Sequence, residues 1–163
     1  MISICFVLGT RPEIIKLAPL IKLCEKKKIN STIIHTGQHF DYNMERRFFR
    51  DFSLKPKYFL KLNSSRSYNR NFVEKAVSKL VDYYKLINPD YIINQGDTNS
   101  VLASALAYKK IRNRIKSKLV HVEAGIRSFD KTMPEEINRI KADKISDILF
   151  APTIIAKKNL INE

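Results

Sequence analysis

The sequence contains little of what marks secreted, membrane or metal-binding proteins. Its 163 residues include two cysteines, Cys5 and Cys24, which are too few for a disulfide framework and lack the spacing of metal ligands. The first apolar run covers residues 2–8, which is too short for a signal peptide or a transmembrane helix, and no later run approaches membrane length. We therefore expect a protein of the reducing cytoplasm that does not enter a membrane.

Acidic residues are also scarce, because 16 aspartates and glutamates face 30 lysines and arginines, for a formal net charge of +14. Such an excess suits nucleic acid, an anionic membrane surface or a small polyanionic substrate. A compositional bias toward lysine, isoleucine and asparagine explains it equally well. The largest basic cluster, residues 109–118, runs from an expected helix end toward a strand. It lacks aromatic side chains and a recognition helix, so we expect a solvated face and no specific nucleic-acid binding.

What the chain does contain is a regular alternation of short apolar runs with segments of helical period. The expected strands cover residues 2–8, 31–36, 58–62, 90–95, 118–122 and 147–151, and the expected helices cover 12–27, 43–52, 69–87, 99–112, 135–146 and a segment from 153. This pattern predicts one α/β domain over residues 1–163, with a Rossmann-like, doubly wound parallel sheet. In that fold the strand order is 3-2-1-4-5-6, and ligands bind between the loops that follow strands 1 and 4.

The glycines support this fold. There are four of them, Gly9, Gly37, Gly96 and Gly125, and each follows an expected strand. Because glycine tolerates positive φ and close backbone approach, the pattern indicates turns at the carboxyl edge of a sheet.

Polar residues follow the same strands, in the segments GTRPEIIK, TGQHFD, NQGDTNS and HVEAGIRSFDKTMPEEINR. Since the carboxyl ends of parallel strands meet at one edge, these segments bring nine polar side chains together. They are Arg11, Lys16, Gln38, His39, Asp97, Thr98, Glu123, Arg127 and Glu135. The convergence predicts a polar ligand site at this edge.

The individual acids differ in how strongly they indicate function. Glu123 ends a buried strand, where an unpaired charge is costly, so we interpret it as functional. Asp97 is open to two interpretations, a functional acid or an acid that favours a helix start. Glu135 and Glu136 follow Pro134, where acids of a first helical turn are ordinary.

Histidines give weaker signals. His35 and His121 lie in expected strands, so we interpret both as core imidazoles with satisfied hydrogen bonds, while His39 in a loop remains open. No spacing of histidine, cysteine and carboxylate resembles a metal site.

Six segments together resemble the non-hydrolysing UDP-N-acetylglucosamine 2-epimerases: GTRPEIIKLAPLI, TGQHFDYN, GDTNSVLASALA, HVEAGIRS, MPEEINR and DILFAPT. The resemblance runs in order over essentially the whole chain. It implies the amino-terminal half of a GT-B architecture, in which two Rossmann-like domains enclose the substrate. The carboxyl-terminal domain, which supplies most uridine and diphosphate contacts in the family, is expected on a separate domain or chain.

The resemblance also implies a chemistry. The family interconverts UDP-N-acetylglucosamine and UDP-N-acetylmannosamine by eliminating UDP across carbons 1 and 2, giving 2-acetamidoglucal, and adding it back. Such a reaction needs carboxylates near carbon 2 and cations around the departing diphosphate. Asp97, Glu123 and Glu135 match the family's essential acids, and Arg11 and Lys16 match its substrate-side cations. No metal, nicotinamide or other cofactor is implied, and a homodimer is compatible with the resemblance.

Two other functions remain as alternatives. One is a non-catalytic remnant that retains the fold and a dimer contact. The other is a non-specific nucleic-acid binder, which rests on the net charge alone.

Overall fold

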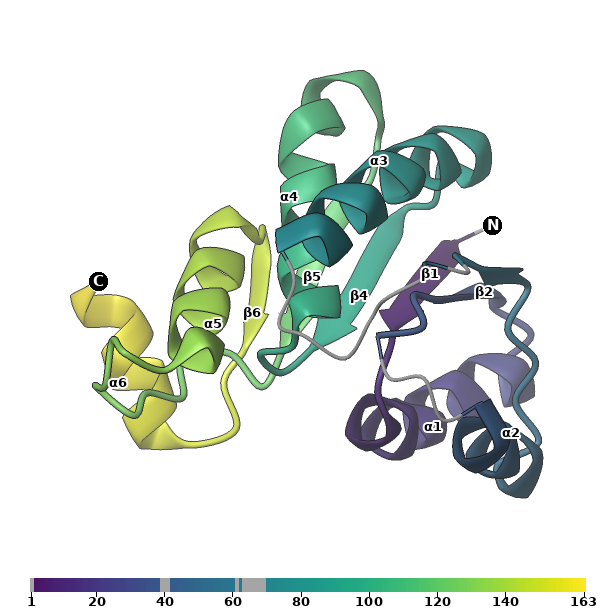
Figure 1. The fold of residues 1–163 in the computed structure, drawn as a ribbon, viewed down its shortest axis with the longest axis horizontal. Coiled ribbons are helices and arrows are strands. Elements are labelled where there is room, and N and C mark those ends of the chain that lie inside the picture. Colours follow the sequence, from purple (N-terminus) through teal and green to yellow (C-terminus); the bar gives the residue numbers. More distant parts are fainter. Residues whose placement is uncertain (1, 39–41, 61, 63–69) are drawn as a thin grey trace.

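The computed structural model describes residues 2–38, 42–60, 62 and 70–163, and within them it shows one parallel sheet with helices on both faces (Figure 1). The strands have the order β3-β2-β1-β4-β5-β6, as the sequence predicted. The strands are β1 (Ser3–Leu8), β2 (Asn30–His35), β3 (Tyr58–Phe59), β4 (Tyr91–Gln95), β5 (Lys118–Val122) and β6 (Ile148–Phe150). The helices are α1 (Arg11–Lys26), α2 (Tyr42–Asp51), α3 (Arg70–Ile87), α4 (Asn99–Ile111), α5 (Pro134–Ile145) and α6 (Ile154–Asn162), with a short 3₁₀ helix at Arg112–Arg114.

The predicted elements are all present, and every predicted bound except the end of the third strand lies within one residue of the observed one. The third strand was expected over residues 58–62, but β3 pairs with β2 only at Tyr58 and Phe59. Leu60 and Leu62 are buried in the core, and residue 61 lies outside the described residues. Their apolar character therefore reflects burial in the core with α3. A short run of apolar residues looks the same in the sequence whether it is buried in this way or forms a strand.

The two faces of the sheet carry separate hydrophobic cores. Alternate residues of β1 divide between them, because successive side chains of a strand point to opposite faces. Cys5 and Val7 pack with α3 and α4, whereas Phe6 and Leu8 pack with α1 and α2. Both faces of the central strands are covered, as Figure 1 also shows. This arrangement leaves the strand ends as the place where loops can form a site.

The chain reverses its winding between β1 and β4, which are neighbours in the sheet. The glycines after β2, β4 and β5 have positive φ, as the turn interpretation predicted. Gly9 after β1 serves close approach instead, since a Cβ there would lie 2.0 Å from Thr36 Oγ1 and 2.1 Å from Ser100 Oγ. The loop after β1 is thus packed against the loop after β2 and the first turn of α4.

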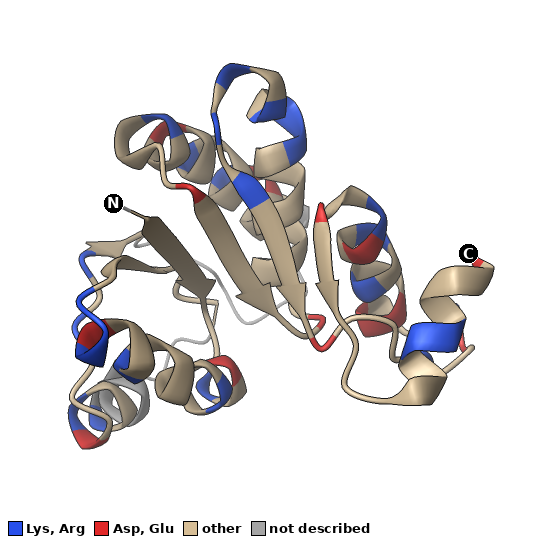
Figure 2. Ribbon diagram, turned by 180° about the vertical axis from the view of Figure 1, so that it is seen from behind, with Lys and Arg blue, Asp and Glu red and all other residues tan. Residues whose placement is uncertain are grey.

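The basic cluster at residues 109–118 lies at the edge of the sheet opposite the carboxyl ends of the strands (Figure 2). Part of its charge is paired, because Arg112 contacts Asp147 at 2.9 Å and Lys116 contacts Asp90 at 2.9 Å. The cluster is therefore separated from the loops that follow the strands. In the described ranges, no helix combines the length and hydrophobicity needed to cross a membrane.

Candidate active site

The loops at the carboxyl edge are tied to one another by hydrogen bonds. Gln38, after β2, accepts hydrogen bonds from the backbone N–H and the hydroxyl of Ser100 at 2.9 and 3.0 Å. The hydroxyls of Thr36 and Ser100 lie 2.6 Å apart. These bonds fix the loop after β2 on the first turn of α4, close to Asp97. His39, which the sequence also placed at this edge, lies outside the described residues.

Glu123 is the most unusual residue of this edge. Its φ of 69° puts a side-chain-bearing residue in the left-handed region, which glycine occupies more readily. Its carboxylate oxygen Oε2 lies 2.7 Å from Nζ of Lys16 on α1 and also accepts a hydrogen bond from Gln95. Backbone strain of this kind occurs often at functional sites, where the surrounding contacts maintain it. The structure thus brings Glu123 and Lys16 together, as the sequence predicted.

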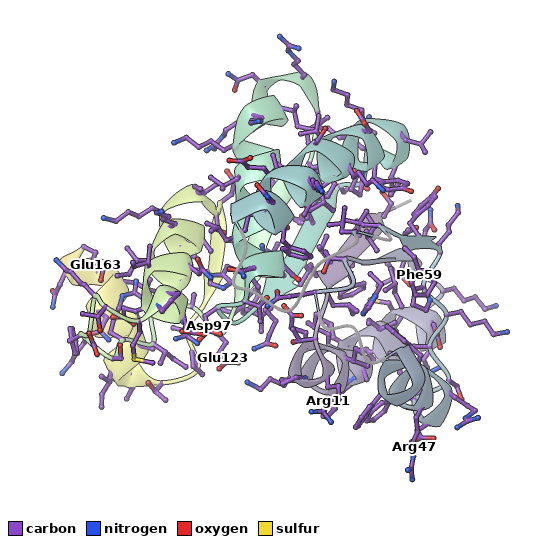
Figure 3. The ribbon with its side chains drawn as sticks, in the orientation of Figure 1. Arg11, Arg47, Phe59, Asp97, Glu123 and Glu163 are labelled. Carbon is purple, nitrogen blue, oxygen red and sulfur yellow. The ribbon has the colours of Figure 1, made fainter. Side chains whose placement is uncertain are left out.

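Asp97 is joined to Glu123 through an arginine that the sequence analysis did not single out. Arg139 on α5 places Nη2 2.5 Å from Oδ2 of Asp97 and 3.9 Å from Oε1 of Glu123. Asn138 donates a hydrogen bond of 3.0 Å to the backbone carbonyl of Asp97. A single, largely buried guanidinium therefore bridges two candidate acids, which lie side by side in Figure 3.

Of the five residues that the resemblance marked, Glu135 and Arg11 are the two that the structure does not connect to the others. Both side chains are exposed, and among the described residues neither has a hydrogen-bond or ion-pair partner. Glu135 lies four residues before Arg139, so the two share one face of α5. Arg11 begins α1, and Figure 3 shows it on the same side of the sheet as Asp97 and Glu123.

Glu136 has a structural role that its sequence context did not indicate. It is buried, and its carboxylate accepts hydrogen bonds of 3.0 Å from the backbone N–H groups of Ser128 and Phe129. The interpretation as an ordinary acid of a first helical turn is therefore incomplete, because the side chain also holds the loop before α5.

Glu13 is a buried acid on α1 that was not among the candidates from the sequence. Its side chain is 1% exposed. It accepts hydrogen bonds of 2.7 Å from the backbone N–H groups of Gly9 and Thr10 through Oε2, and one of 2.7 Å from the Thr98 hydroxyl through Oε1. Burial raises the pKa of Glu13 to about 6, although these hydrogen bonds oppose the shift. Its signal in the sequence is the T-x-x-E pattern of a capping box at Thr10.

His121 has two partners in the core, which confirms the interpretation of it as a satisfied imidazole. Its Nδ1 lies 2.7 Å from Oδ1 of Asp143, and its Nε2 lies 2.7 Å from the carbonyl oxygen of Gly96. Although burial opposes the change, hydrogen bonds from His121 and Arg127 lower the pKa of Asp143. This network fastens α5 to the loop that carries Asp97.

Arg127 belongs to that network and not to the ligand side of the edge, where the sequence had placed it. Its side chain is 1% exposed, with Nη2 2.7 Å from Asp143 and Nε 2.8 Å from Glu163. His35 is likewise buried, beside the rings of Phe49 and Phe59 at 5.1 and 5.6 Å between centroids. Burial lowers its pKa to about 4, so His35 is neutral near pH 7.

Within the part of the chain that the structure describes, no group of three or more histidine, cysteine, aspartate or glutamate side chains could hold a metal ion. The edge instead combines carboxylates with cations that contact them. Such a set can move a proton and balance negative charge on a bound ligand.

Comparison with known proteins identifies the family. The family model for UDP-N-acetylglucosamine 2-epimerase matches residues 21–163. The chain belongs to this family. The UDP-N-acetylglucosamine 2-epimerase of Methanocaldococcus jannaschii is 47% identical over 165 residues, which cover 99% of this chain and 43% of that protein. Its crystal structure in complex with UDP-N-acetylglucosamine and UDP superposes with a TM-score of 0.90 at 46% identity, over 99% of this chain and 43% of that one.

A second relative acts on another sugar according to its name. The UDP-2,3-diacetamido-2,3-dideoxy-D-glucuronate 2-epimerase of Pseudomonas aeruginosa is 40% identical over 163 residues, covering 99% of this chain and 44% of that protein. The chain therefore spans less than half the length of these relatives. It corresponds to the amino-terminal half of an epimerase, as the sequence predicted.

Proposed function

We propose that this chain provides the acid/base half of an epimerase that interconverts UDP-N-acetylglucosamine and UDP-N-acetylmannosamine. In the forward direction a carboxylate takes the proton from carbon 2 of the sugar. The electron pair of the broken C–H bond forms the double bond between carbons 1 and 2, and UDP leaves with the C1–O pair. Addition of the proton to the opposite face, followed by return of UDP, inverts carbon 2.

The observation that carries this proposal is the arrangement of Asp97, Glu123 and Arg139. Two carboxylates at the ends of neighbouring strands share one guanidinium, at 2.5 and 3.9 Å. Inversion at one carbon needs groups that lie close together, so that one can take the proton from one face and another can return a proton to the opposite face. A cation between them lets both remain near each other without strong repulsion. Glu135 joins this set on the exposed face of α5, where a substrate could reach it.

Cations on α1 suit the departing group. Lys16 is half exposed while it contacts Glu123, and Arg11 is exposed at the start of the helix. A diphosphate leaving group carries negative charge that such side chains stabilise. We assign Arg11 and Lys16 to the substrate on this basis.

The proposed enzyme also needs a second polypeptide part, which corresponds to the part of the relatives that this chain does not match. Nine of the fourteen exposed large hydrophobic side chains in the described ranges lie between residues 129 and 161. They include all three residues of β6, which forms an edge of the sheet in Figure 1. A parallel sheet is normally covered on both faces, and an exposed apolar patch indicates a binding surface. We assign this surface to the missing part, which would close the cleft over the sugar nucleotide.

Complementation tests the function. The purified chain is mixed with the part of the Methanocaldococcus jannaschii epimerase that it does not match, and UDP-N-acetylglucosamine is supplied in deuterium oxide. We expect formation of UDP-N-acetylmannosamine with deuterium at carbon 2, and no turnover with either part alone. Asp97→Asn and Glu123→Gln should each lower turnover by roughly 10² to 10⁴, as expected for a positioned acid or base.

Glu74→Gln is the matched control, because Glu74 is an exposed glutamate on α3, away from the carboxyl edge. Glu136→Gln is unsuitable as a control, since it replaces one of the two oxygens that accept hydrogen bonds from the backbone N–H groups of Ser128 and Phe129. Normal turnover by Glu123→Gln would contradict the assignment of this acid. Turnover of only the diacetamido-glucuronate substrate would contradict the assignment of the sugar.

A further inference from the structure

Glu13 lies between the two loops of the switch point and contacts both. Its Oε2 accepts hydrogen bonds from Gly9 and Thr10, which form the loop after β1, at 2.7 Å each. Its Oε1 accepts a hydrogen bond of 2.7 Å from Thr98, in the loop after β4 and 85 residues away. One buried carboxylate thus joins the two segments between which a ligand of this fold binds.

Each end of this bridge is next to a residue of the candidate site. Thr98 directly follows Asp97, and its hydroxyl also caps α4 by accepting a hydrogen bond of 3.3 Å from Val101 N–H. On the other side, Glu13 lies on α1, three residues before Lys16 and within one turn of it. Helical geometry therefore makes the position of Lys16 depend on the position of Glu13.

Asp97 is then held from two directions. Asn138 and Arg139 contact its carbonyl and carboxylate from α5, while Glu13 holds the next residue, Thr98, from α1. Without the second contact, none of the described hydrogen bonds joins α1 to the loop after β4. Lys16 reaches Glu123 only through its flexible, half-exposed side chain.

The chemistry of Glu13 suits a bridge and not a proton carrier. The side chain is 1% exposed and accepts hydrogen bonds on both oxygens. Its local bonds to Gly9 and Thr10 would satisfy a helix start alone, but they do not require Oε1 to meet Thr98. A glutamate at this position of a capping box usually reaches back only to its own helix start. The additional bond, from the Thr98 hydroxyl in the loop after β4, is the feature that helix capping does not explain.

We propose that Glu13 is a positioning residue that fixes the spacing between the cations of α1 and the acid Asp97. This inference rests on the proposed function for its kinetic consequence, while the bridge itself can be tested without activity. Glu13 touches no substrate in this assignment. It acts through Thr98 on one side and through the first turn of α1 on the other.

Four variants separate the bridge from its parts. Glu13→Gln keeps the shape but replaces one acceptor oxygen by a donor NH₂ group, so the Thr98 hydroxyl, which donates to Glu13, would have to accept from it instead while it also accepts from Val101 N–H. Glu13→Asp keeps the charge and is one methylene shorter, so it cannot span both loops. Thr98→Val removes the hydroxyl, whereas Thr98→Ser keeps it. Thr153→Val is the matched control for a lost helix cap, because Thr153 caps α6 by the same geometry, with a bond of 3.1 Å from Ala156 N–H.

Amide hydrogen exchange on the isolated chain tests directly whether Glu13 connects the loops after β1 and β4. We expect Glu13→Gln and Glu13→Asp to speed exchange of the Val101 and Leu102 amides, which lie on the far side of the crevice in the first turn of α4. Thr98→Val should speed exchange at Gly9 and Thr10, and Thr153→Val should change neither group. If the Glu13 variants affect only Gly9 and Thr10, Glu13 is a local cap and the proposal is wrong.

Steady-state kinetics of the complemented enzyme with UDP-N-acetylglucosamine measure the effect of the same variants on catalysis. We expect Glu13→Gln and Thr98→Val to lower kcat by roughly 10-fold to 100-fold with little change in KM, because misplacement of a reacting group by about 1 Å costs this much. Thr98→Ser should lose far less than Thr98→Val. The double variant Glu13→Gln/Asp97→Asn should be no slower than Asp97→Asn, since Glu13 acts through Asp97.

Losses that multiply in the double variant would show that Glu13 acts on folding alone, and would overturn the positioning role. If the complemented wild-type chain does not turn over, the proposed function fails, and the exchange pattern at Val101 and Leu102 still decides whether the bridge exists. The two failures are therefore distinct.

Discussion

Glu123 combines a left-handed backbone with a carboxylate that contacts Lys16. For a residue with a Cβ this conformation costs about 1 kcal/mol more than for glycine. We therefore expect Glu123→Gly to be more stable than Glu123→Ala by about 1 kcal/mol, while both variants lose turnover.

Glu123→Ala is the matched control, because both variants lose the same hydrogen bonds and ion pair and differ in the backbone cost. Urea unfolding of the isolated chain provides the free energies. Equal stability of the two variants would mean that the left-handed conformation at Glu123 is not strained, and would remove this support for a functional role.

Glu13 shows a related cost through its protonation. Burial raises its pKa from 4.5 to about 6, so the folded state binds this proton more tightly than the unfolded state does. Its contribution to stability is then full below pH 4.5 and is lost as pH rises through about 6. A shift of this size corresponds to about 2 kcal/mol.

We expect the free energy of unfolding of the wild-type chain, minus that of Glu13→Gln, to fall by about 2 kcal/mol between pH 4 and pH 7. Urea unfolding at a series of pH values measures it, and groups common to both proteins cancel in the difference. A difference that is constant with pH, or that rises, would show that the hydrogen bonds to Glu13 outweigh burial and that the pKa of Glu13 is not raised.

At the scale of helices and strands, the sequence was sufficient for the order and type of nearly every element. Period-2 and period-3.6 patterns report which faces are buried, and in this fold most elements are buried on a regular face. The pattern extended β3 too far, because Leu60 and Leu62 are buried in the core with α3 while the pairing of β3 with β2 ends at Phe59. Strand pairing depends on a neighbouring strand that is distant in the sequence, and a local sequence pattern carries no information about it.

The candidate site was partly predictable for the same reason. Asp97 and Glu123 could be found because they follow strands, and the fold places strand ends together. Arg139 could not be found from the sequence, because nothing in its local sequence indicates that its guanidinium extends from α5 to both acids. Glu13 had a local signal in its capping box, but its bond to Thr98 crosses 85 residues of sequence. Helix termini are thus readable from sequence, whereas contacts across the switch point are not.

For the whole molecule, the uneven distribution of exposed apolar side chains is the feature with the clearest consequence. Phe150 on β6 is 59% exposed and lies at the sheet edge, within the surface that we assign to the second polypeptide part. Leu86 on α3 is 70% exposed but lies outside that surface. Replacing either with lysine leaves the core of this chain intact, because both side chains are already largely in water.

The two substitutions should therefore differ in assembly and not in folding. We expect Phe150→Lys to weaken binding of the complementary part of the Methanocaldococcus jannaschii epimerase by at least tenfold, because burial of a lysine charge at the edge of a sheet replaces burial of a phenyl ring. Leu86→Lys should bind like the wild-type chain. Calorimetric titration measures both affinities, and urea unfolding checks that the two variants are equally folded. Equal affinities would show that the second part docks elsewhere, in which case the apolar residues from 129 to 161 are not its binding surface.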